Sequence, residues 1–420
     1  MNNRPVFIDL FAGCGGLSLG LEQAGFFPIF VNELNKDALG TYLLNRKHIN
    51  PLLSEKYFSY DVKDLVLNES TINNLIEGFK NDYSINTTNG DVDLIVGGPP
   101  CQGFSGIGHR RSYSVEKKQL PSNLLYQDMA FIINAFQPKI FLFENVRGLL
   151  NSKWTNHGVN GEIWQDVLFT FKSLKGYKVN YALVHAKDYG VPQNRPRVLL
   201  VGIRDDINLK VLNNNFIAGG FLPSPKGGYP NLSDLLGDLL DNNYFITGLT
   251  SKYPKEAITP IQIELRKNPF NNMVSKEGDP LTEQVYSNHS PQIVNKFQYM
   301  LEHNGEIPEE MKTRKFSQRV LPREWGHSGP TITATSMPDD YIHFEQPRIL
   351  TVREWARLQL FPDWYQFVGK RTTGGIRRAG NPREGIYDRE LPKYTQIGNA
   401  VPVGLAKEVG LHFLKLLGYQ

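Results

Sequence analysis

Cysteine is scarce in this sequence: its 420 residues contain only Cys14 and Cys101. Two cysteines cannot build a disulfide scaffold, and they argue against a cysteine-based structural zinc site. The sequence also lacks the HExxH pattern of zinc hydrolases and the P-loop of nucleotide triphosphatases. We therefore expect neither a disulfide framework nor a metal centre.

Long apolar runs are missing as well. No run reaches the roughly 18 residues that a membrane helix needs. The start of the chain, MNNRPVFIDLF, lacks the features of a secretory signal, so the expected compartment is the cytoplasm. Net charge is small, since 46 basic and 42 acidic residues give +4, which is a weak indication of a polyanionic partner.

The chain is long enough for two or three domains, and its first 205 residues read as α/β. Short apolar runs alternate there with helical patterns, which favours a mostly parallel sheet with helices on both faces. The predicted strands are 6–11, 28–31, 93–96, 140–144, 178–184 and 198–203, and helical spacing predicts helices near 125–136 and 163–174.

The pattern changes after Arg204. A Gly/Pro-rich stretch covers 219–230, and 230–345 shows no strand–helix alternation. A helical pattern returns from Arg348, and a last helix near 403–417 is expected to dock back on the first domain. We therefore predict one domain over 1–205, completed by 391–420, and a second, irregular domain over 206–390.

A glycine-rich turn follows the first strand, in Phe7-Ile-Asp-Leu-Phe-Ala-Gly-Cys-Gly-Gly-Leu17. Gly13, Gly15 and Gly16 let a ligand approach the backbone, and the following helix offers free amide donors. Glu33 closes the next strand, where an acid can bind ribose hydroxyls, and Asp61 closes a third apolar stretch. The glycines alone do not separate a dinucleotide from S-adenosylmethionine, or either from an ordinary strand–turn–helix.

The second motif places a cysteine just beyond a strand, in Asp93-Leu-Ile-Val-Gly-Gly-Pro-Pro-Cys-Gln-Gly-Phe-Ser105. Ligands in such sheets bind at the carboxyl ends of strands. Its glycine, proline and polar flanks favour an accessible, reactive thiolate at Cys101 over a buried structural cysteine.

Two further motifs are less specific when each is taken alone. Glu144 directly follows an apolar strand in Phe141-Leu-Phe-Glu-Asn-Val-Arg147, where its carboxyl could stay protonated and act as an acid. Arg195 and Arg197, in Gln193-Asn-Arg-Pro-Arg197, could hold a phosphate or a carbonyl oxygen.

Together these four motifs resemble the cytosine-5 DNA methyltransferase family of the bacterial restriction–modification type. The match continues in 348–362 (RILTVREWARLQLFP) and 396–402 (QIGNAVP). It covers about 5–204 and 345–415, and the unmatched middle is where this family's target recognition varies. The resemblance implies a Rossmann-like, S-adenosylmethionine-dependent methyltransferase domain with a smaller, irregular target-recognition domain. Leu34 departs from the aromatic residue that many members carry there.

The resemblance also implies the chemistry. Cys101 would add to C6 of a cytosine, Glu144 would donate to N3, Arg197 would face O2, and Arg195 would support the pocket. The cofactor S-adenosyl-L-methionine would be bound by Phe11, Ala12, Gly13, Gly15, Gly16, Leu17, Glu33, Leu34, Asp61, Val62, Pro100, Leu125, Asn399, Ala400 and Val401.

The implied partner is double-stranded DNA, with the target base flipped out at a cost of about a few kcal/mol. We expect the loop 103–123 to close over the DNA. The segment 370–383, which carries five basic residues and no acid, is expected to contact phosphates. Side chains that could reach base edges are Arg266, Lys267, Arg314, Lys315, Gln318, Arg319 and Arg323.

Alternatives remain at this point. A tRNA cytosine would need the same chemistry, although an unmatched middle of about 140 residues favours a DNA-reading domain. A nicotinamide oxidoreductase would leave the Cys101 and Glu144 motifs unexplained, and a silent DNA-binding regulator would not need them. The leading hypothesis is a monomeric methyltransferase that is paired with a separate restriction endonuclease.

Overall fold

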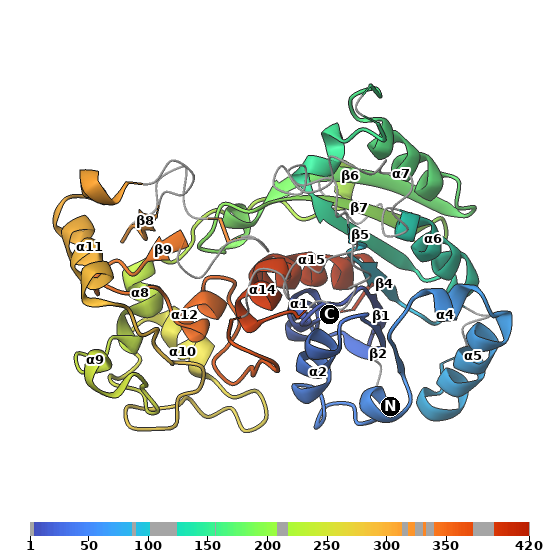
Figure 1. Cartoon of the computed structure of the whole chain (residues 1–420). Coiled ribbons are helices and arrows are strands. Elements are labelled where there is room, and N and C mark those ends of the chain that lie inside the picture. Colours follow the sequence, from blue (N-terminus) through green and yellow to red (C-terminus); the bar gives the residue numbers. More distant parts are fainter. Residues whose placement is uncertain are drawn as a thin grey trace. The chain divides into compact units, whose positions relative to one another are not determined.

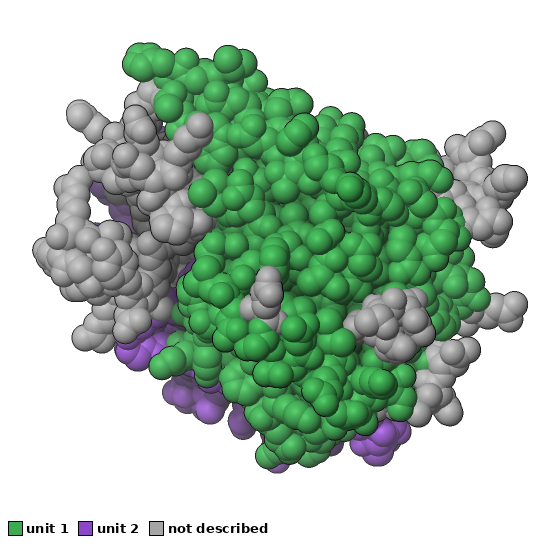
Figure 2. All heavy atoms as spheres, turned by 90° about the vertical axis from the view of Figure 1, so that its right-hand side faces the viewer, with its two compact units in different colours: residues 1–189, 196–226, 403–420 green, residues 190–195, 227–402 purple. Residues whose placement is uncertain are grey.

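The computed structural model describes residues 4–85, 90–100, 124–155, 157–207, 217–312, 318–323, 331–332, 340–372 and 390–419 (Figure 1). Cys101, the loop 103–123, Arg314, Lys315 and 373–383 of the basic segment lie outside these residues. The chain forms two compact units, coloured separately in Figure 2: unit 1 comprises 1–189, 196–226 and 403–420, and unit 2 comprises 190–195 and 227–402.

Unit 1 is built on a seven-stranded sheet in the order β3-β2-β1-β4-β5-β7-β6. The strands are β1 (Val6–Leu10), β2 (Phe27–Asn32), β3 (Phe58–Ser59), β4 (Leu94–Gly97), β5 (Ile140–Val146), β6 (Tyr177–His185) and β7 (Pro196–Arg204). The first five run parallel, while β7 is antiparallel to both β5 and β6. Strands β1 and β4 are buried throughout, and their sequences are apolar except for Asp9 in β1. The predicted α/β class is confirmed.

Helices cover both faces of this sheet, with α1 and α15 on one face and α6 and α7 on the other (Figure 1). The helices of unit 1 are α1 (Gly16–Ala24), α2 (Lys36–Leu44), α3 (Leu52–Glu55), α4 (Lys63–Val66), α5 (Glu69–Tyr83), α6 (Leu125–Phe136), α7 (Glu162–Lys172) and α15 (Val403–Leu416). Within the described ranges, none has both the length and the apolarity to cross a membrane.

Helices α1 and α15 touch through their backbones, because two glycines lie at the crossing. A Cβ atom on Gly20 would come within 2.4 Å of the Ala406 Cβ and 2.5 Å of the Val403 carbonyl oxygen. A Cβ on Gly410 would lie 2.8 Å from the Ala24 Cβ. The close approach brings the last helix against the helix that follows the glycine-rich turn.

Unit 2 is irregular, with short elements and many turns. Its helices are α8 (Leu232–Leu236), α9 (Tyr244–Thr247), α10 (Pro260–Arg266), α11 (Pro291–Glu302), α12 (Val352–Arg357) and α14 (Lys393–Asn399), and its strands are β8 (Arg319–Val320) and β9 (Tyr341–Ile342). Capping boxes fix the starts of α10 and α12, where Thr259 and Thr351 are the capping residues.

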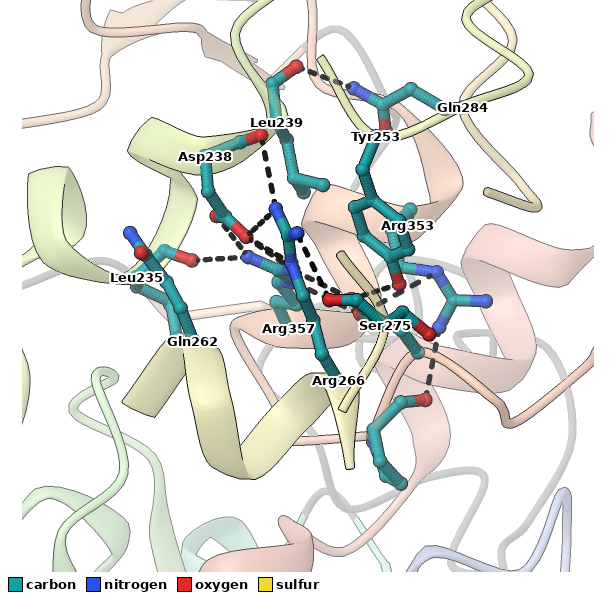
Figure 3. A network of polar contacts seen from close by, with 12 residues as sticks. Leu235, Asp238, Leu239, Tyr253, Gln262, Arg266, Ser275, Gln284, Arg353 and Arg357 are labelled. Carbon is teal, nitrogen blue, oxygen red and sulfur yellow. Dashed lines mark hydrogen bonds and ion pairs between the residues drawn. The ribbon is translucent and has the colours of Figure 1, made fainter. Parts of the chain in front are cut away.

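Buried ion pairs connect several elements of unit 2 (Figure 3). The Arg357 guanidinium contacts both Asp238 and Asp363 at 2.6 Å, and Arg266 contacts Asp238 at 2.6 Å. The expectation that Arg266 could reach base edges is therefore wrong, because its side chain is 2% exposed and is held by Asp238. Helical propensity and charge could not show that this arginine faces inward.

The borders of the compact units differ from the predicted domain borders. Unit 1 extends to residue 226, and its last segment begins at residue 403. The sequence predicts these two borders at 205 and 391. The stretch 217–226 belongs with the sheet, since His412 of α15 hydrogen-bonds the Gly220 carbonyl at 2.8 Å. The assignment of target recognition to the second unit stays a prediction.

Candidate active site

The glycine-rich turn leaves the carboxyl end of β1 at the point where the strand order reverses. Strands β1 and β4 are neighbours there, although β2 and β3 lie between them in sequence. Phe11, Gly13 and Gly15 all have positive φ angles (58°, 58° and 86°), so the chain turns sharply before α1 begins at Gly16. Such a switch point is the usual ligand site of an open parallel sheet.

Glu33 braces this turn from the end of β2. One carboxylate oxygen accepts from the Gly13 amide at 2.8 Å, and the other accepts from the Asn35 amide at 2.7 Å. Burial raises the pKa of Glu33, and the two amide hydrogen bonds oppose that rise. Since each carboxylate oxygen can accept more than one hydrogen bond, Glu33 can brace the turn and still accept from ribose hydroxyls.

The surroundings of the turn fit a nucleoside cofactor. A Cβ on Gly13 would meet no atom of the described residues within 4 Å, so among these residues the turn is open at this glycine. The Leu34 side chain is 69% exposed next to Glu33, and Asp61 is exposed just after β3. An uncovered apolar side chain and two carboxylates along one sheet edge suit the base and ribose of S-adenosylmethionine.

The predicted cofactor residues belong to both units. Phe11, Ala12, Gly13, Gly15, Gly16, Leu17, Glu33, Leu34, Asp61, Val62, Pro100 and Leu125 belong to unit 1, whereas Asn399, Ala400 and Val401 belong to unit 2. Asn399 ends α14 with an exposed side chain, and Ala400 is buried. Cofactor binding by each of these residues stays a prediction.

The two cysteines differ in what the sequence places around them, and the structure describes one of them. Cys14 lies inside the glycine-rich turn with 1% of its surface exposed. Burial raises the pKa of the Cys14 thiol to about 12, so it stays protonated and unreactive near neutral pH. A cysteine nucleophile in this chain can therefore only be Cys101.

Glu144 lies against the segment that leads to Cys101. A Cβ on Gly98 would be 2.9 Å from the Glu144 carboxylate, so only glycine leaves room for that acid. The next residue, Asn145, donates its side-chain amide to the Pro99 carbonyl at 3.1 Å. Two consecutive residues at the end of β5 thus contact the backbone at Gly98 and Pro99, and Pro99 is two residues before the cysteine.

Arg197 is the charged partner of Glu144. Its Nε atom lies 2.5 Å from a Glu144 oxygen, and both side chains are almost entirely buried. Burial lowers the pKa of Arg197, while the adjacent Glu144 raises it. Within unit 1 the structure brings together these two predicted catalytic residues at the carboxyl edge of the sheet.

Arg195 binds backbone carbonyls of unit 2. Its guanidinium donates to the backbone carbonyls of Gly398 (2.6 Å), Ala400 (3.1 Å) and Ile332. These bonds hold Gly398 and Ala400 of the QIGNAVP motif, whereas the resemblance implied that Arg195 supports the target pocket. A direct role of Arg195 in catalysis stays a prediction.

Sequence reasoning missed two residues that organise this region. Gln193 donates to the Gln359 side chain at 2.9 Å and accepts from the Ile332 amide at 2.8 Å, while Asn145 holds Pro99. Both stand inside the quoted motifs, directly beside or two residues from a predicted catalytic side chain. Gln193 lies in the bend before β7 and Asn145 lies in β5, so no single local pattern marked both.

The described part of the basic segment is partly neutralised. Lys370 pairs with Glu390 at 2.7 Å, and Arg371 donates to the Val285 carbonyl at 3.0 Å. Of the predicted base readers, Lys267, Arg319 and Arg323 are exposed, whereas Gln318 is buried. Among the described residues, no group of three His, Cys, Asp or Glu side chains could hold a metal ion.

Comparison with known proteins identifies the family. The model of the C-5 cytosine-specific DNA methylase family matches residues 6–415. The type II methyltransferase M.DdeI of Desulfomicrobium norvegicum is 32% identical, over 95% of this chain and 86% of that protein. The type II methyltransferase M.XorII of Xanthomonas oryzae pv. oryzae is 28% identical, over 99% of this chain and 85% of that protein.

Solved structures share the fold. A DNA modification methyltransferase encoded within an Escherichia coli prophage superposes with a TM-score of 0.63 at 23% identity, covering 99% of each chain. The Entamoeba histolytica methyltransferase EhMeth gives a TM-score of 0.54 at 14% identity, also over 99% of each chain. With the family match along almost the whole sequence, we conclude that the chain belongs to the C-5 cytosine-specific DNA methylase family and is a DNA cytosine-5 methyltransferase.

Proposed function

We propose that Cys101 is the nucleophile of this methyltransferase and that Glu144 and Arg197 hold the target cytosine. One observation carries the proposal: Glu144 and Asn145 lie against Gly98 and Pro99, which lead directly to Cys101, while the other cysteine is buried. A nucleophile and an acid that arise from neighbouring strand ends can act on opposite sides of one ring.

The proposed chemistry balances at the cytosine ring. The Cys101 thiolate forms a bond to C6 while Glu144 donates to N3, which makes C5 nucleophilic. S-adenosyl-L-methionine, when bound at the glycine-rich turn, supplies the electrophilic methyl group. Transfer of the C5 proton to a water molecule, return of the N3 proton to Glu144 and breakage of the C6–sulfur bond then restore the ring, the acid and the thiolate. Arg197 faces the O2 edge and keeps the Glu144 carboxyl in place.

We further propose that the substrate is a specific sequence in double-stranded DNA, from which the cytosine is flipped out. A stacked base cannot be attacked at C6, so extrusion is a physical requirement. The family match and the type II relatives favour a role in modification alongside a separate endonuclease. Parallel assays on duplex DNA and on tRNA separate this substrate from the tRNA alternative.

A covalent trap tests the nucleophile. Duplex DNA with 5-fluorocytosine at the target should form a stable adduct with the native enzyme and cofactor, because fluorine at C5 cannot leave as a proton does. Cys101→Ser should form no adduct, and Cys14→Ala should form as much as the native enzyme. An adduct that persists in Cys101→Ser would overturn the proposal. Bisulfite sequencing of DNA from expressing cells would identify the target sequence.

A further inference from the structure

Arg46 is a buried arginine that the proposed chemistry does not use. It follows α2 by two residues, and 1% of its side chain is exposed. Its Nε lies 2.5 Å from a Glu22 oxygen, one terminal nitrogen donates to the Tyr42 carbonyl at 2.9 Å, and the other donates to the Gly15 carbonyl at 3.4 Å. The guanidinium also stacks on the Tyr42 ring, 3.7 Å from its centre.

The orientation of the Gly15 carbonyl affects the whole start of α1. Gly15 is the N-cap of α1, and its carbonyl also accepts the first hydrogen bond of that helix, from the Leu19 amide at 2.9 Å. A positive φ of 86° sets the direction of the adjoining amides. Whatever orients this carbonyl therefore orients the amide donors at the helix start, which a cofactor would meet.

The segment 33–46, which contains α2, thus hydrogen-bonds the glycine-rich turn at two points. Before α2, Glu33 accepts from the Gly13 amide, and after α2, Arg46 donates to the Gly15 carbonyl. Because Glu22 lies on α1, Arg46 also ties the far part of α1 to the same segment. The planar guanidinium can serve three acceptors in fixed directions, which a lysine ammonium on a flexible stem does less well.

We propose that Arg46 is a positioning residue for the methyl donor: it fixes the glycine-rich turn in the conformation that binds S-adenosylmethionine. The inference rests on the proposed cofactor site and adds a residue outside the motifs that define the family resemblance. Arg46 acts on affinity for the cofactor and not on the chemical step, because it contacts the turn, α1 and α2, whereas Glu144 lies on β5.

Direct binding of S-adenosylhomocysteine, the demethylated cofactor, tests this role without turnover. We expect Arg46→Met to weaken binding, measured by calorimetry on the full-length protein without DNA, by about 10- to 100-fold, the range for a lost charged hydrogen bond. Arg46→Lys should recover part of this loss. At saturating cofactor, kcat should stay within about threefold of native, so that KM for the donor carries the effect.

Arg204→Met is the matched control. Arg204 is a partly buried arginine of the same unit that pairs with Asp206 at 2.7 Å and donates to the Gln137 carbonyl at 2.8 Å. It stands at the last residue of β7, which runs antiparallel to β5, so it lies at the opposite edge of the sheet from the turn. A general loss of stability would weaken cofactor binding in both variants, whereas the proposed role affects only Arg46.

Amide hydrogen exchange measures the order of the glycine-rich turn without any cofactor. In the unliganded protein, amides of residues 13–19 should exchange faster in Arg46→Lys than in native protein, even if Arg46→Met does not fold. Native-like binding and native-like exchange in both Arg46 variants would refute the positioning role. If native protein itself fails to bind S-adenosylhomocysteine, the proposed cofactor site is wrong instead.

Discussion

The carboxylate of Glu144 and the guanidinium of Arg197 lie 2.5 Å apart on adjacent antiparallel strands, and both are buried. In the register of β5 with β7, Val146 stands opposite Arg197, so the pair is formed diagonally across the two strands. Breaking a buried ion pair leaves an uncompensated charge, which costs about 3–5 kcal/mol in comparable cases. The same contact therefore supports the fold and, by our proposal, the target pocket.

Glu144→Gln removes both the acid and the negative charge that pairs with Arg197. The amide keeps the shape of the side chain and removes the acidic proton, so we expect kcat to fall by about 100- to 10,000-fold, the usual contribution of acid–base catalysis. Cofactor binding should change little, because Glu33 and the glycine-rich turn are untouched. Methyl transfer to duplex DNA and S-adenosylhomocysteine calorimetry measure the two effects. Asp206→Asn, which removes an exposed acid from the Arg204 pair, is the control.

Gly98→Ala tests whether catalysis depends on the close packing of Glu144 against the segment that leads to Cys101. The added methyl group would lie 2.9 Å from a Glu144 oxygen, closer than van der Waals contact allows. Because the carboxylate must move, we expect at least a tenfold loss of kcat, by analogy with misplaced catalytic groups. Gly237→Ala is a suitable control, since its added Cβ would meet no atom within 4 Å in the part of the chain that the structure describes. Unchanged kcat in Gly98→Ala would show that Glu144 does not need its present position.

How far the sequence predicts this structure depends on the kind of contact. The strands of the sheet follow from apolar runs, and only the two-residue β3 (Phe58–Ser59) escapes prediction because so short a segment carries no periodicity. The strand predicted over 6–11 ends at Leu10, since Phe11 already adopts the left-handed conformation of the turn. Such a backbone angle is set by the turn as a whole.

The site shows the same limit. The motifs point to Glu144 and Arg197, and the structure brings both together within unit 1. They do not show that Arg195 binds backbone carbonyls, that Arg266 is buried against Asp238, or that Arg46 reaches Gly15. An arginine has the same local signature whether it faces solvent or a buried carboxylate, so only the tertiary structure assigns its partner.

Asp9 should make the stability of unit 1 depend on pH. Burial raises the pKa of Asp9 to about 7, with Ser18 and Arg46 opposing and Glu22 and Glu33 reinforcing the rise. Since the folded protein then holds a proton that the unfolded chain releases near pH 4, this residue's contribution falls as pH rises from 4 to 7 and is constant above 7.

Asp9→Asn removes this titration while keeping an oxygen that can accept from the Ser18 hydroxyl. The free energy of unfolding of the variant, relative to native protein, should therefore increase between pH 4 and pH 7, by at most about 4 kcal/mol. Urea unfolding at several pH values gives the measurement. A difference between variant and native protein that is independent of pH would show that Asp9 is ionised throughout this range.

The crossing of α1 and α15 gives the sharpest prediction about packing. In Gly20→Ala the new Cβ would lie 2.4 Å from the Ala406 Cβ and 2.5 Å from the Val403 carbonyl oxygen, so the helices must separate. We expect a loss of about 1–3 kcal/mol in the free energy of unfolding, as for other overpacked contacts. Adding Ala406→Gly should restore only part of it, because the Val403 carbonyl and the Lys407 amide are backbone atoms that no substitution removes. Urea unfolding of the single and double variants measures these changes in the free energy of unfolding, with Gly237→Ala as the unhindered control. Full restoration by Ala406→Gly would mean that the two helix backbones are farther apart than the structure places them.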